Sequence, residues 1–367
     1  MKIGTGRRSA ALAAVLVVVL AGCRGVTPAD PSSGSDATAP GTTRAPAPPS
    51  SPPPSGSTPS STISSPSGSP SRSSAAVAGT APAPQPKVAL PPAAGSEISG
   101  IAAGADPGVL LVADDGAGPQ PVTAVRPDGT SLATVTLDGV DASNIEALAG
   151  APCGAGAAER CLYIGDIGEA RSTVTVYRAP MPSAPQWRAA AEAWTYRYPA
   201  GPDGVRRRNA EALLIAPNGD VLIIDKPATA GGKVLPHRVF RGARGGGELQ
   251  LAGSFTPPRP TVPLQSLVTG TVVTDAYYGA GTPAMPARVL LLTYDQVLQY
   301  TAPGPGADPA EFYRWPVRRL SMPDADQAEG ITGLDDGCGY VVASEAGPLA
   351  QSSTLATVSC AETKEPP

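Results

Sequence analysis

The feature that most constrains the fold of this chain is a unit of four short apolar runs that recurs about every 45–65 residues. The units open with similar segments: EISGIAAG (97–104), NIEALAGA (144–151), NAEALLIA (209–216), TGTVVTDA (269–276) and QAEGITGL (327–334). Runs of Val, Leu, Ile and Tyr separated by Gly, Pro, Asp and Asn are typical of strands and turns. Four antiparallel strands repeated at this period are typical of β-propeller blades. The sequence therefore predicts an all-β fold, with a single β-propeller of four-stranded blades over residues 87–361.

The two ends of the repeat predict how the ring closes. The last unit lacks its fourth run, and a spare run, Lys87-Val88-Ala89-Leu90, precedes the first unit. Pairing this N-terminal strand with the last unit would leave no open sheet edge. We expect five blades, or six if a long insertion hides one. A two-sheet sandwich is the alternative, but it does not explain five units in register.

The first residues carry an export signal. Lys2, Arg7 and Arg8 precede an apolar run over 10–20, which is too short to span a bilayer and has the length of a signal-peptide core. The run ends in Leu-Ala-Gly-Cys at 20–23, which resembles the lipobox of bacterial lipoproteins. We expect a lipoprotein signal peptide at 1–22 and a lipid on Cys23 that anchors the chain to the outer face of the cell membrane. An ordinary secretory peptide is the alternative.

Composition separates the anchor from the propeller. Residues 23–86 are rich in Pro, Ser, Thr and Ala and hold almost no large apolar side chains, so they cannot bury enough surface to order themselves. We expect a disordered linker here, acting as a stalk that reaches a cell-wall or protein partner, and a disordered tail at 362–367. The Ala, Gly and Pro bias is typical of a high-GC genome such as that of an actinobacterium.

Four cysteines remain when Cys23 is set aside, and disulfides persist in exported chains. Three pairings exist. We favour Cys153–Cys161 and Cys338–Cys360, because each pair joins strands that should already be neighbours. Reactive thiols are the alternative.

Two rings of polar residues are expected at the blade starts, because the first strand of each blade lines the tunnel. One ring comprises Ser99, Glu146, Glu211, Thr271 and Glu329, and the ring two residues earlier comprises Glu97, Asn144, Asn209, Thr269 and Gln327. Residues two apart lie on the same strand face. The next residues on that face are aliphatic, so the tunnel should be polar at one mouth and plugged beneath.

Clustered carboxylates require a raised pKa or a nearby cation. Oxygen-only ligands suit Ca²⁺ or Mg²⁺. The expected ligands are Glu97, Asn144, Glu146, Asn209, Glu211, Gln327 and Glu329. Alternatively, these groups bind backbone amides of the neighbouring blade and lock the ring.

A further polar set ends the second strands and should lie near the same mouth, or near the tunnel wall: Asp114, Asp115, Asp166, Asp225, Lys226 and Glu345, with Tyr294, Asp295 and Ser344 in the remaining places. Lys226 is the one cation in this set. It would form a salt bridge with a ring carboxylate, or it would attract an anionic ligand.

The motifs NIEALAG, YIGDIGEA, NAEALLI and QAEGI, in this order, resemble those of uncharacterised secreted β-propellers of actinobacteria, which are similar to the phytase-like and gluconolactonase-like propeller group. The resemblance implies the propeller fold and a tunnel mouth able to hold a cation. The chain departs from the pattern at Glu169-Ala170, where Asp-Asn is usual, and at Val272, where an acid is expected.

The function classes narrow accordingly. A net charge of −4 argues against nucleic-acid binding, and a single histidine, His237, makes a Ser-His-Asp site improbable. We expect a cell-envelope lipoprotein that displays a propeller for ligand or protein binding. The alternative is a Ca²⁺-dependent hydrolase of a phosphoester, lactone or ester. Whether the protein is an enzyme stays open, with binding favoured.

Overall fold

The computed structural model describes residues 83–84 and 86–360, except 116–121, 202–203, 228, 231–232, 261–268 and 348–351. The predicted signal peptide, Cys23, most of the predicted linker and the predicted tail lie outside these residues. Among the described residues, no helix is both long and apolar enough to cross a bilayer.

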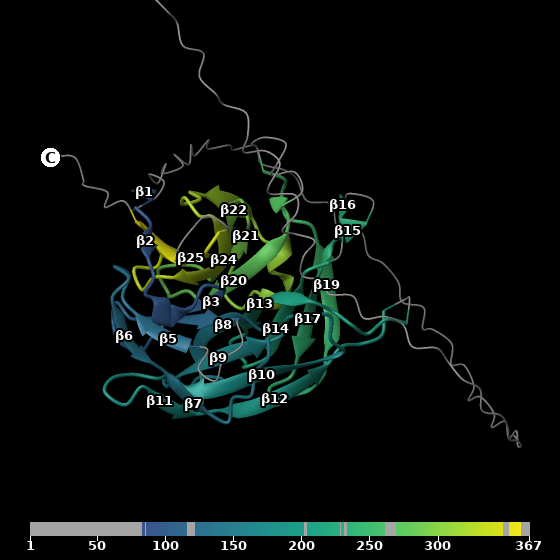
Figure 1. Ribbon diagram of the computed structural model, residues 1–367. Helices are drawn as coiled ribbons and strands as arrows, with labels where there is room; N and C mark the ends of the chain where they lie inside the picture. Colours follow the sequence, from purple (N-terminus) through teal and green to yellow (C-terminus); the bar gives the residue numbers. More distant parts are fainter. Residues whose placement is uncertain are drawn as a thin grey trace, which may run out of the picture. The chain divides into compact units, whose positions relative to one another are not determined.

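The described chain forms five four-stranded antiparallel blades, which confirms the predicted propeller (Figure 1). From the inner to the outer strand, the first blade is β3 (Ile98–Ala103), β4 (Leu110–Asp114), β5 (Val122–Val125) and β6 (Ser131–Thr134), and the second is β8 (Ile145–Pro152), β9 (Arg160–Asp166), β10 (Thr173–Pro180) and β12 (Glu192–Arg197). The third blade is β13 (Ala210–Ile215), β14 (Val221–Asp225), β17 (His237–Gly242) and β19 (Gln250–Phe255). The fourth blade is β20 (Val273–Gly279), β21 (Arg288–Thr293), β22 (Gln296–Thr301) and β23 (Val317–Leu320). The fifth blade is β24 (Gln327–Gly333), β25 (Tyr340–Glu345), β26 (Thr354–Ser359) and the N-terminal strands.

The N-terminal strands close the ring, as the sequence predicts. β2 (Val88–Ala89) pairs with β26 of the last blade. β1 (Ala83–Pro84) pairs with the end of the same strand, so regular pairing begins four residues before Lys87. The innermost strands β3, β8, β13, β20 and β24 gather at the middle of Figure 1, and each contacts the next around a complete circle.

Smaller elements lie outside the blades. They are the parallel pair β7 (Thr136–Asp138) and β11 (Arg188–Ala190), the hairpin β15 (Thr229–Ala230) and β16 (Lys233–Val234), β18 (Gly247–Glu248) beside β12, and the short 3-10 helices η1 (Pro92–Ala94) and η2 (Pro309–Arg314).

The hydrophobic core is divided into five clusters, one between each pair of adjacent blades. The cluster between the second and third blades packs Tyr163 and Trp194 of one against Leu213 and Phe240 of the other. The corresponding clusters fill the four other blade interfaces. Each blade is therefore apolar on both faces, and no blade can bury its surface without its neighbours.

Two disulfides have the predicted pairing, Cys153–Cys161 and Cys338–Cys360. The first bridges the turn between β8 and β9. The second joins the turn before β25 to the end of β26, in the blade that closes the ring.

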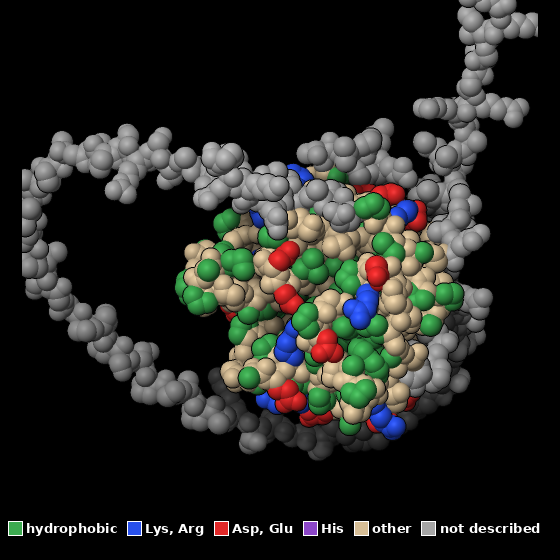
Figure 2. All heavy atoms as spheres, turned by 90° about the vertical axis from the view of Figure 1, so that its left-hand side faces the viewer, with side chains coloured by type: hydrophobic (Ala, Val, Ile, Leu, Met, Phe, Trp, Pro, Cys, Tyr) green, Lys and Arg blue, Asp and Glu red, His purple; other side chains and the backbone are tan. Residues whose placement is uncertain are grey.

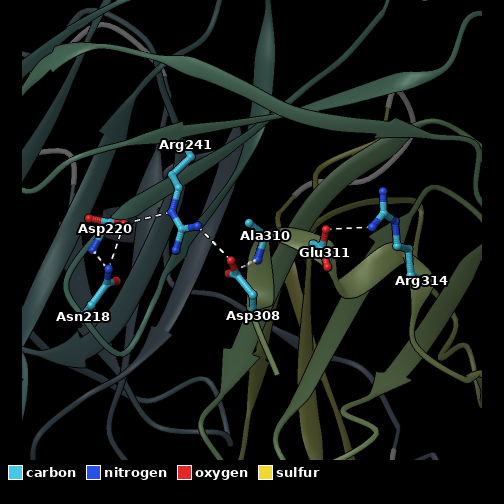
Figure 3. A network of polar contacts seen from close by, with 7 residues as sticks. All are labelled: Asn218, Asp220, Arg241, Asp308, Ala310, Glu311 and Arg314. Atoms are coloured by element: carbon cyan, nitrogen blue, oxygen red, sulfur yellow. Dashed lines mark hydrogen bonds and ion pairs between the residues drawn. The ribbon is translucent and has the colours of Figure 1, made fainter. Parts of the chain in front are cut away.

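A polar network adds a surface link between the third and fourth blades (Figure 3). The Arg241 guanidinium on β17 lies between Asp220, at 2.9 Å, and Asp308, at 2.8 Å. Asp308 also accepts a hydrogen bond from the backbone N–H of Ala310 and so caps η2. Elsewhere, on the side at the left of Figure 1, Figure 2 shows acidic and basic side chains of the described residues dispersed among apolar ones.

Candidate functional site

Every blade has a β-bulge at the same place in its innermost strand. The register between the first and second strands shifts across one residue in each blade, and these residues are Ser99, Glu146, Glu211, Thr274 and Glu329. A bulge adds one unpaired residue and re-aims its side chain. We call these five residues the ring.

The fourth blade corrects the predicted alignment. Its ring residue is Thr274, not Thr271, because β20 begins three residues later than the aligned segment. A turn, in which the backbone N–H of Val272 donates to the carbonyl of Thr269, takes up the difference. Thr271 precedes β20, and its carbonyl oxygen lies 2.7 Å from Nε2 of His237.

Amide side chains two residues before the ring position support the glutamates. Nδ2 of Asn209 donates to Oε1 of Glu211 at 2.9 Å, and Nε2 of Gln327 donates to Oε1 of Glu329 at 3.1 Å. The amide-x-Glu motif is therefore a repeated structural unit. We define the mouth as the ring together with the amide residues Asn144, Asn209 and Gln327 and with Lys226.

In the second blade, Gly168 makes room for the same motif. A Cβ at this position would overlap Oδ1 of Asn144 and Oε1 of Glu146. The second glycine of the Gly-Asp-Ile-Gly sequence is thus required by the mouth side chains themselves, since its φ is not in the left-handed region.

Lys226 supplies a positive charge within the mouth. Its Nζ lies 3.2 Å from Oε1 of Glu211 and donates to the Tyr294 hydroxyl at 3.2 Å. The same Nζ lies 5.5 Å from the centre of the Tyr294 ring, within cation–π range. Burial opposes the charge, but Glu211, Tyr294 and Glu329 together raise the pKa of Lys226 well above its usual value.

The three ring glutamates come from three different blades and influence one another's pKa. Burial, and then the neighbouring Glu211, raise the pKa of Glu146 well above its usual range. Burial also raises the pKa of Glu211, against the opposing effects of Lys226 and of a hydrogen bond with Glu146. Two carboxyl groups form a hydrogen bond only if they share a proton. Burial, assisted by Glu211 and Glu345, raises the pKa of Glu329 to about 8 despite the opposing charge of Lys226.

More carboxylates surround this centre. Burial, Glu97 and Glu345 raise the pKa of Asp115 to about 7, and burial with Glu97 raises that of Glu345 to about 6. Gln327 also donates to Glu345. The backbone N–H of Glu97 donates to Asp114 at 3.3 Å. The mouth and its surroundings are therefore rich in carboxyl groups, and Lys226 is the one ammonium that interacts with the ring glutamates among the described residues.

Three oxygens at the mouth have no hydrogen-bond partner among the described residues: Oδ1 of Asn144, Oδ1 of Asn209 and Oγ1 of Thr274. Thr274 is 1% exposed. Ser99, its counterpart in the first blade, instead donates to the carbonyl of Ile145 in the second blade. Buried polar atoms are nearly always partnered, so unpartnered ones indicate a ligand or water.

Other predicted residues hold the ends of the strands together. Asp166 accepts from the backbone N–H of Asn144 at 3.0 Å and from Arg171 at 2.8 Å. Asp225 accepts from the backbone N–H of Arg238 at 2.6 Å, and burial raises its pKa to about 6. These two aspartates thus bind backbone amides, whereas Asp114, Asp115 and Glu345 lie among the carboxylates near the mouth.

Asp295 and Ser344, which also end second strands, likewise hold neighbouring segments together by hydrogen bonds. Asp295 accepts from the hydroxyl of Thr269 at 2.6 Å. The Ser344 hydroxyl donates to the carbonyl of Gln327 at 3.0 Å and accepts from its N–H at 2.9 Å.

The donor set can be tested against the expected calcium ion. Carboxylate oxygens of Glu97, Asp114 and Asp115 lie within 4.8 Å of one another, a spacing that Ca²⁺ ligation needs. Within the described part of the chain, the ring glutamates form no such set. The Lys226 ammonium also lies among them, so the ring fits a protein cation better than a divalent metal. Calcium stays a prediction.

Sequence reasoning missed Asp275, the residue after the fourth ring position. The other blades have Gly or Ala there. Asp275 is fully buried and accepts from the backbone N–H groups of Ala276, at 2.7 Å, and of Ile331 in the fifth blade, at 2.8 Å. Burial raises its pKa well above its usual value. Placing VTDA under AEGI in the alignment would have found it.

The fold and the mouth define the class: a five-bladed β-propeller with an acidic ring at one end of its axis. No family model and no curated protein sequence matches the chain. Among solved structures, it is similar to the α-L-arabinofuranosidase Arb93A of Fusarium graminearum in complex with an iminosugar inhibitor (10% identity, 78% of this chain, 100% of that chain, TM-score 0.43).

Two further similar structures are a putative 6-phosphogluconolactonase of Bacteroides fragilis (12% identity, 69% of this chain, 62% of that one, TM-score 0.32) and the Pan2 WD40 domain of Neurospora crassa (10% identity, 72% and 64%, TM-score 0.28). The chain thus covers less than two thirds of the length of these two structures. At these identities the likeness concerns the fold alone.

Proposed function

We propose that this protein is a ligand-binding propeller of the cell envelope, tethered by a lipid on Cys23 through the segment rich in Pro, Ser, Thr and Ala, and that its ligand binds at the mouth. The observation that carries the proposal is the combination of an acidic ring around Lys226 with three oxygens that have no hydrogen-bond partner among the described residues. The predicted lipobox supports the tether, and the two disulfides suit an exported protein.

The energetics favour a site over a purely structural ring. Leaving a buried polar group without a partner costs about 1–3 kcal/mol, and burying carboxyl groups beside one another raises the cost. The blade interfaces are filled by five apolar clusters, which contribute to closure independently of the ring. A costly polar centre in a scaffold with such a core is typical of a functional site.

The binding test is the thermal shift of the full-length protein with Ca²⁺, Mg²⁺, cadaverine or glucose, each against a no-ligand sample containing EDTA. We expect at least one probe to raise the midpoint in the wild type and to lose its effect in Glu211→Gln. Glu159→Gln is the matched control, because Glu159 is exposed on the turn bridged by Cys153–Cys161. The proposal fails if no probe shifts the midpoint, or if both variants respond as the wild type does.

The tether has its own test. The wild-type protein should fractionate with membranes and label with a fatty-acid analogue, and Cys23→Ser should do neither. Recovery of both forms in the soluble fraction would contradict the lipid anchor and leave the binding test unaffected.

A hydrolase acting on a phosphoester, lactone or ester, with Ca²⁺-activated water, is the second candidate. Carboxyl groups whose pKa is raised toward neutrality, such as Glu329 and the Glu146–Glu211 pair, are typical of general acid–base catalysis. Turnover of chromogenic phosphoester or lactone substrates that requires Ca²⁺ and is lost in Glu146→Gln would favour it.

A further inference from the structure

The mouth offers far more hydrogen-bond acceptors than donors. The ring glutamates are surrounded by Asp115 and Glu345, and Lys226 is the one ammonium that interacts with them in the described residues. The amide N–H groups of Asn209 and Gln327 already donate to ring glutamates. The groups of the mouth that still lack a partner among the described residues are therefore hydrogen-bond acceptors.

The unpartnered oxygens point the same way. The amide oxygens of Asn144 and Asn209 can only accept hydrogen bonds, and neither has a donor among the described residues. Thr274 provides an independent observation, since its hydroxyl is almost completely buried at a ring position and is also unpartnered. The Thr274 hydroxyl can donate as well as accept, whereas a ligand that satisfies the two amide oxygens must bring N–H or O–H donors, or a positive charge.

Lys226 shows which chemical group this environment accepts. Its ammonium meets a carboxylate and a phenol oxygen, contributed by Glu211 and Tyr294. The carboxyl of Glu146, which hydrogen-bonds with Glu211, and the two free amide oxygens present acceptors of the same kind. The second and third blades thus hold an acceptor set comparable to the one that receives Lys226.

Charge and spacing narrow the ligand further. An anion would meet the acceptor oxygens of the ring, and a neutral polyol could not replace the proton that Glu146 and Glu211 share, whereas an ammonium group could. A divalent metal needs ligand oxygens about 2.3–2.6 Å away, whereas an ammonium nitrogen accepts a wider shell at about 2.7–2.9 Å. The ring glutamates lack the close spacing of a metal-ligand set within the described residues.

We propose that the mouth binds a primary ammonium group on an aliphatic chain, the chemistry shared by a diamine and a lysine side chain. This inference rests on the ligand site proposed above. The ammonium is received by Glu146, Glu211 and the amide oxygens of Asn144 and Asn209, beside the resident ammonium of Lys226.

Isothermal titration calorimetry of the full-length protein tests this chemistry. The probes are cadaverine and Nα-acetyl-lysine methylamide, which distinguish a free diamine from a peptide side chain. Pentane-1,5-diol is the uncharged control for the first, and the Nε-acetylated form is the control for the second. We expect one or both amines to bind, and neither uncharged control to do so.

Variants locate the binding. Glu146→Gln should weaken amine binding by about 30-fold or more, the usual effect of removing one partner of a desolvated charge pair. Glu159→Gln should leave the affinity unchanged. Gly168→Ala gives a second test without loss of charge, since its methyl group displaces Asn144 and Glu146, and it should also weaken binding.

The outcomes separate this inference from the proposed function. If Ca²⁺ or glucose binds in a manner sensitive to Glu211→Gln while neither amine binds, the ammonium inference is wrong and the mouth remains a ligand site. If amines bind equally to the wild type and to both mouth variants, binding is nonspecific and the inference is again wrong. If no probe binds, both proposals fail.

Discussion

Replacing Glu329 by glutamine tests how the ionisation of one buried ring carboxyl affects the stability of the protein. The side chain is 8% exposed, and glutamine keeps its shape and can still accept the hydrogen bond from Nε2 of Gln327. What the substitution removes is the ability to ionise beside Glu211 and Glu345. Any pH-dependent difference between wild type and Glu329→Gln therefore reports this carboxyl.

The direction follows from its raised pKa. An unfolded glutamate ionises near pH 4.5, whereas folding raises the pKa of Glu329 to about 8. Between these values the folded state binds more protons than the unfolded state, so the stability of the wild type falls as pH rises. Each pKa unit corresponds to about 1.4 kcal/mol, and the wild type should lose roughly 3–4 kcal/mol relative to Glu329→Gln between pH 5 and pH 8.

Urea denaturation of the full-length proteins at pH 5, 6, 7 and 8 measures this difference. We expect the two free energies of unfolding to converge near pH 5 and Glu329→Gln to become the more stable form toward pH 8. Glu159→Gln should follow the wild type throughout. Parallel curves for wild type and Glu329→Gln would refute the argument, because they would mean that this carboxyl does not hold its proton in the folded state.

Three further predictions concern glycines and a disulfide. Gly168→Ala should change the midpoint of thermal unfolding little, as should its control Gly304→Ala, because the atoms that its methyl group meets are the ends of side chains that can rotate. Gly100→Ala should lower the free energy of unfolding by about 1–3 kcal/mol in urea denaturation, because a Cβ there would lie 2.6 Å from a backbone nitrogen of the next blade. Replacing Cys338 and Cys360 by alanine should cost ~3 kcal/mol by the same measurement, since the bridge closes a 22-residue separation in the blade that completes the ring. An unchanged stability in either of the last two variants would contradict the reasoning for it.

The repeat predicted most of the fold because two independent features mark each blade in the sequence. One is its set of four apolar runs, and the other is the polar segment that begins its first strand. Strand order, the closure by Val88–Ala89 and both disulfide pairs follow from that pattern. The additional pair β7 and β11 and the helix η2 could not be predicted, because elements of three to six residues are too short to show a periodicity.

The register of the fourth blade was predicted wrongly because its sequence permits two alignments three residues apart. In TGTVVTDA, Thr271 and Thr274 both offer a hydroxyl for the ring position, and a turn not visible in the pattern selects the second. The salt bridge between Lys226 and a ring carboxylate was one of two predicted roles, and the structure pairs Lys226 with Glu211. Its contact with Tyr294 depends on the packing of separate blades, which local sequence does not specify.

The fourth blade also explains why the ring is asymmetric. Its carboxylate, Asp275, lies one position past the ring and is buried against the backbone of the fifth blade, which leaves the hydroxyl of Thr274 at the ring itself. The acids of the ring are adjacent in the second and third blades, whereas Glu329 of the fifth blade is flanked by the ring positions of Thr274 and Ser99. Lys226 interacts with Glu211 and Glu329 on either side of this neutral position. The adjacent pair, which shares its proton and lies next to the free amide oxygens, is then the part of the ring left to receive a second cation.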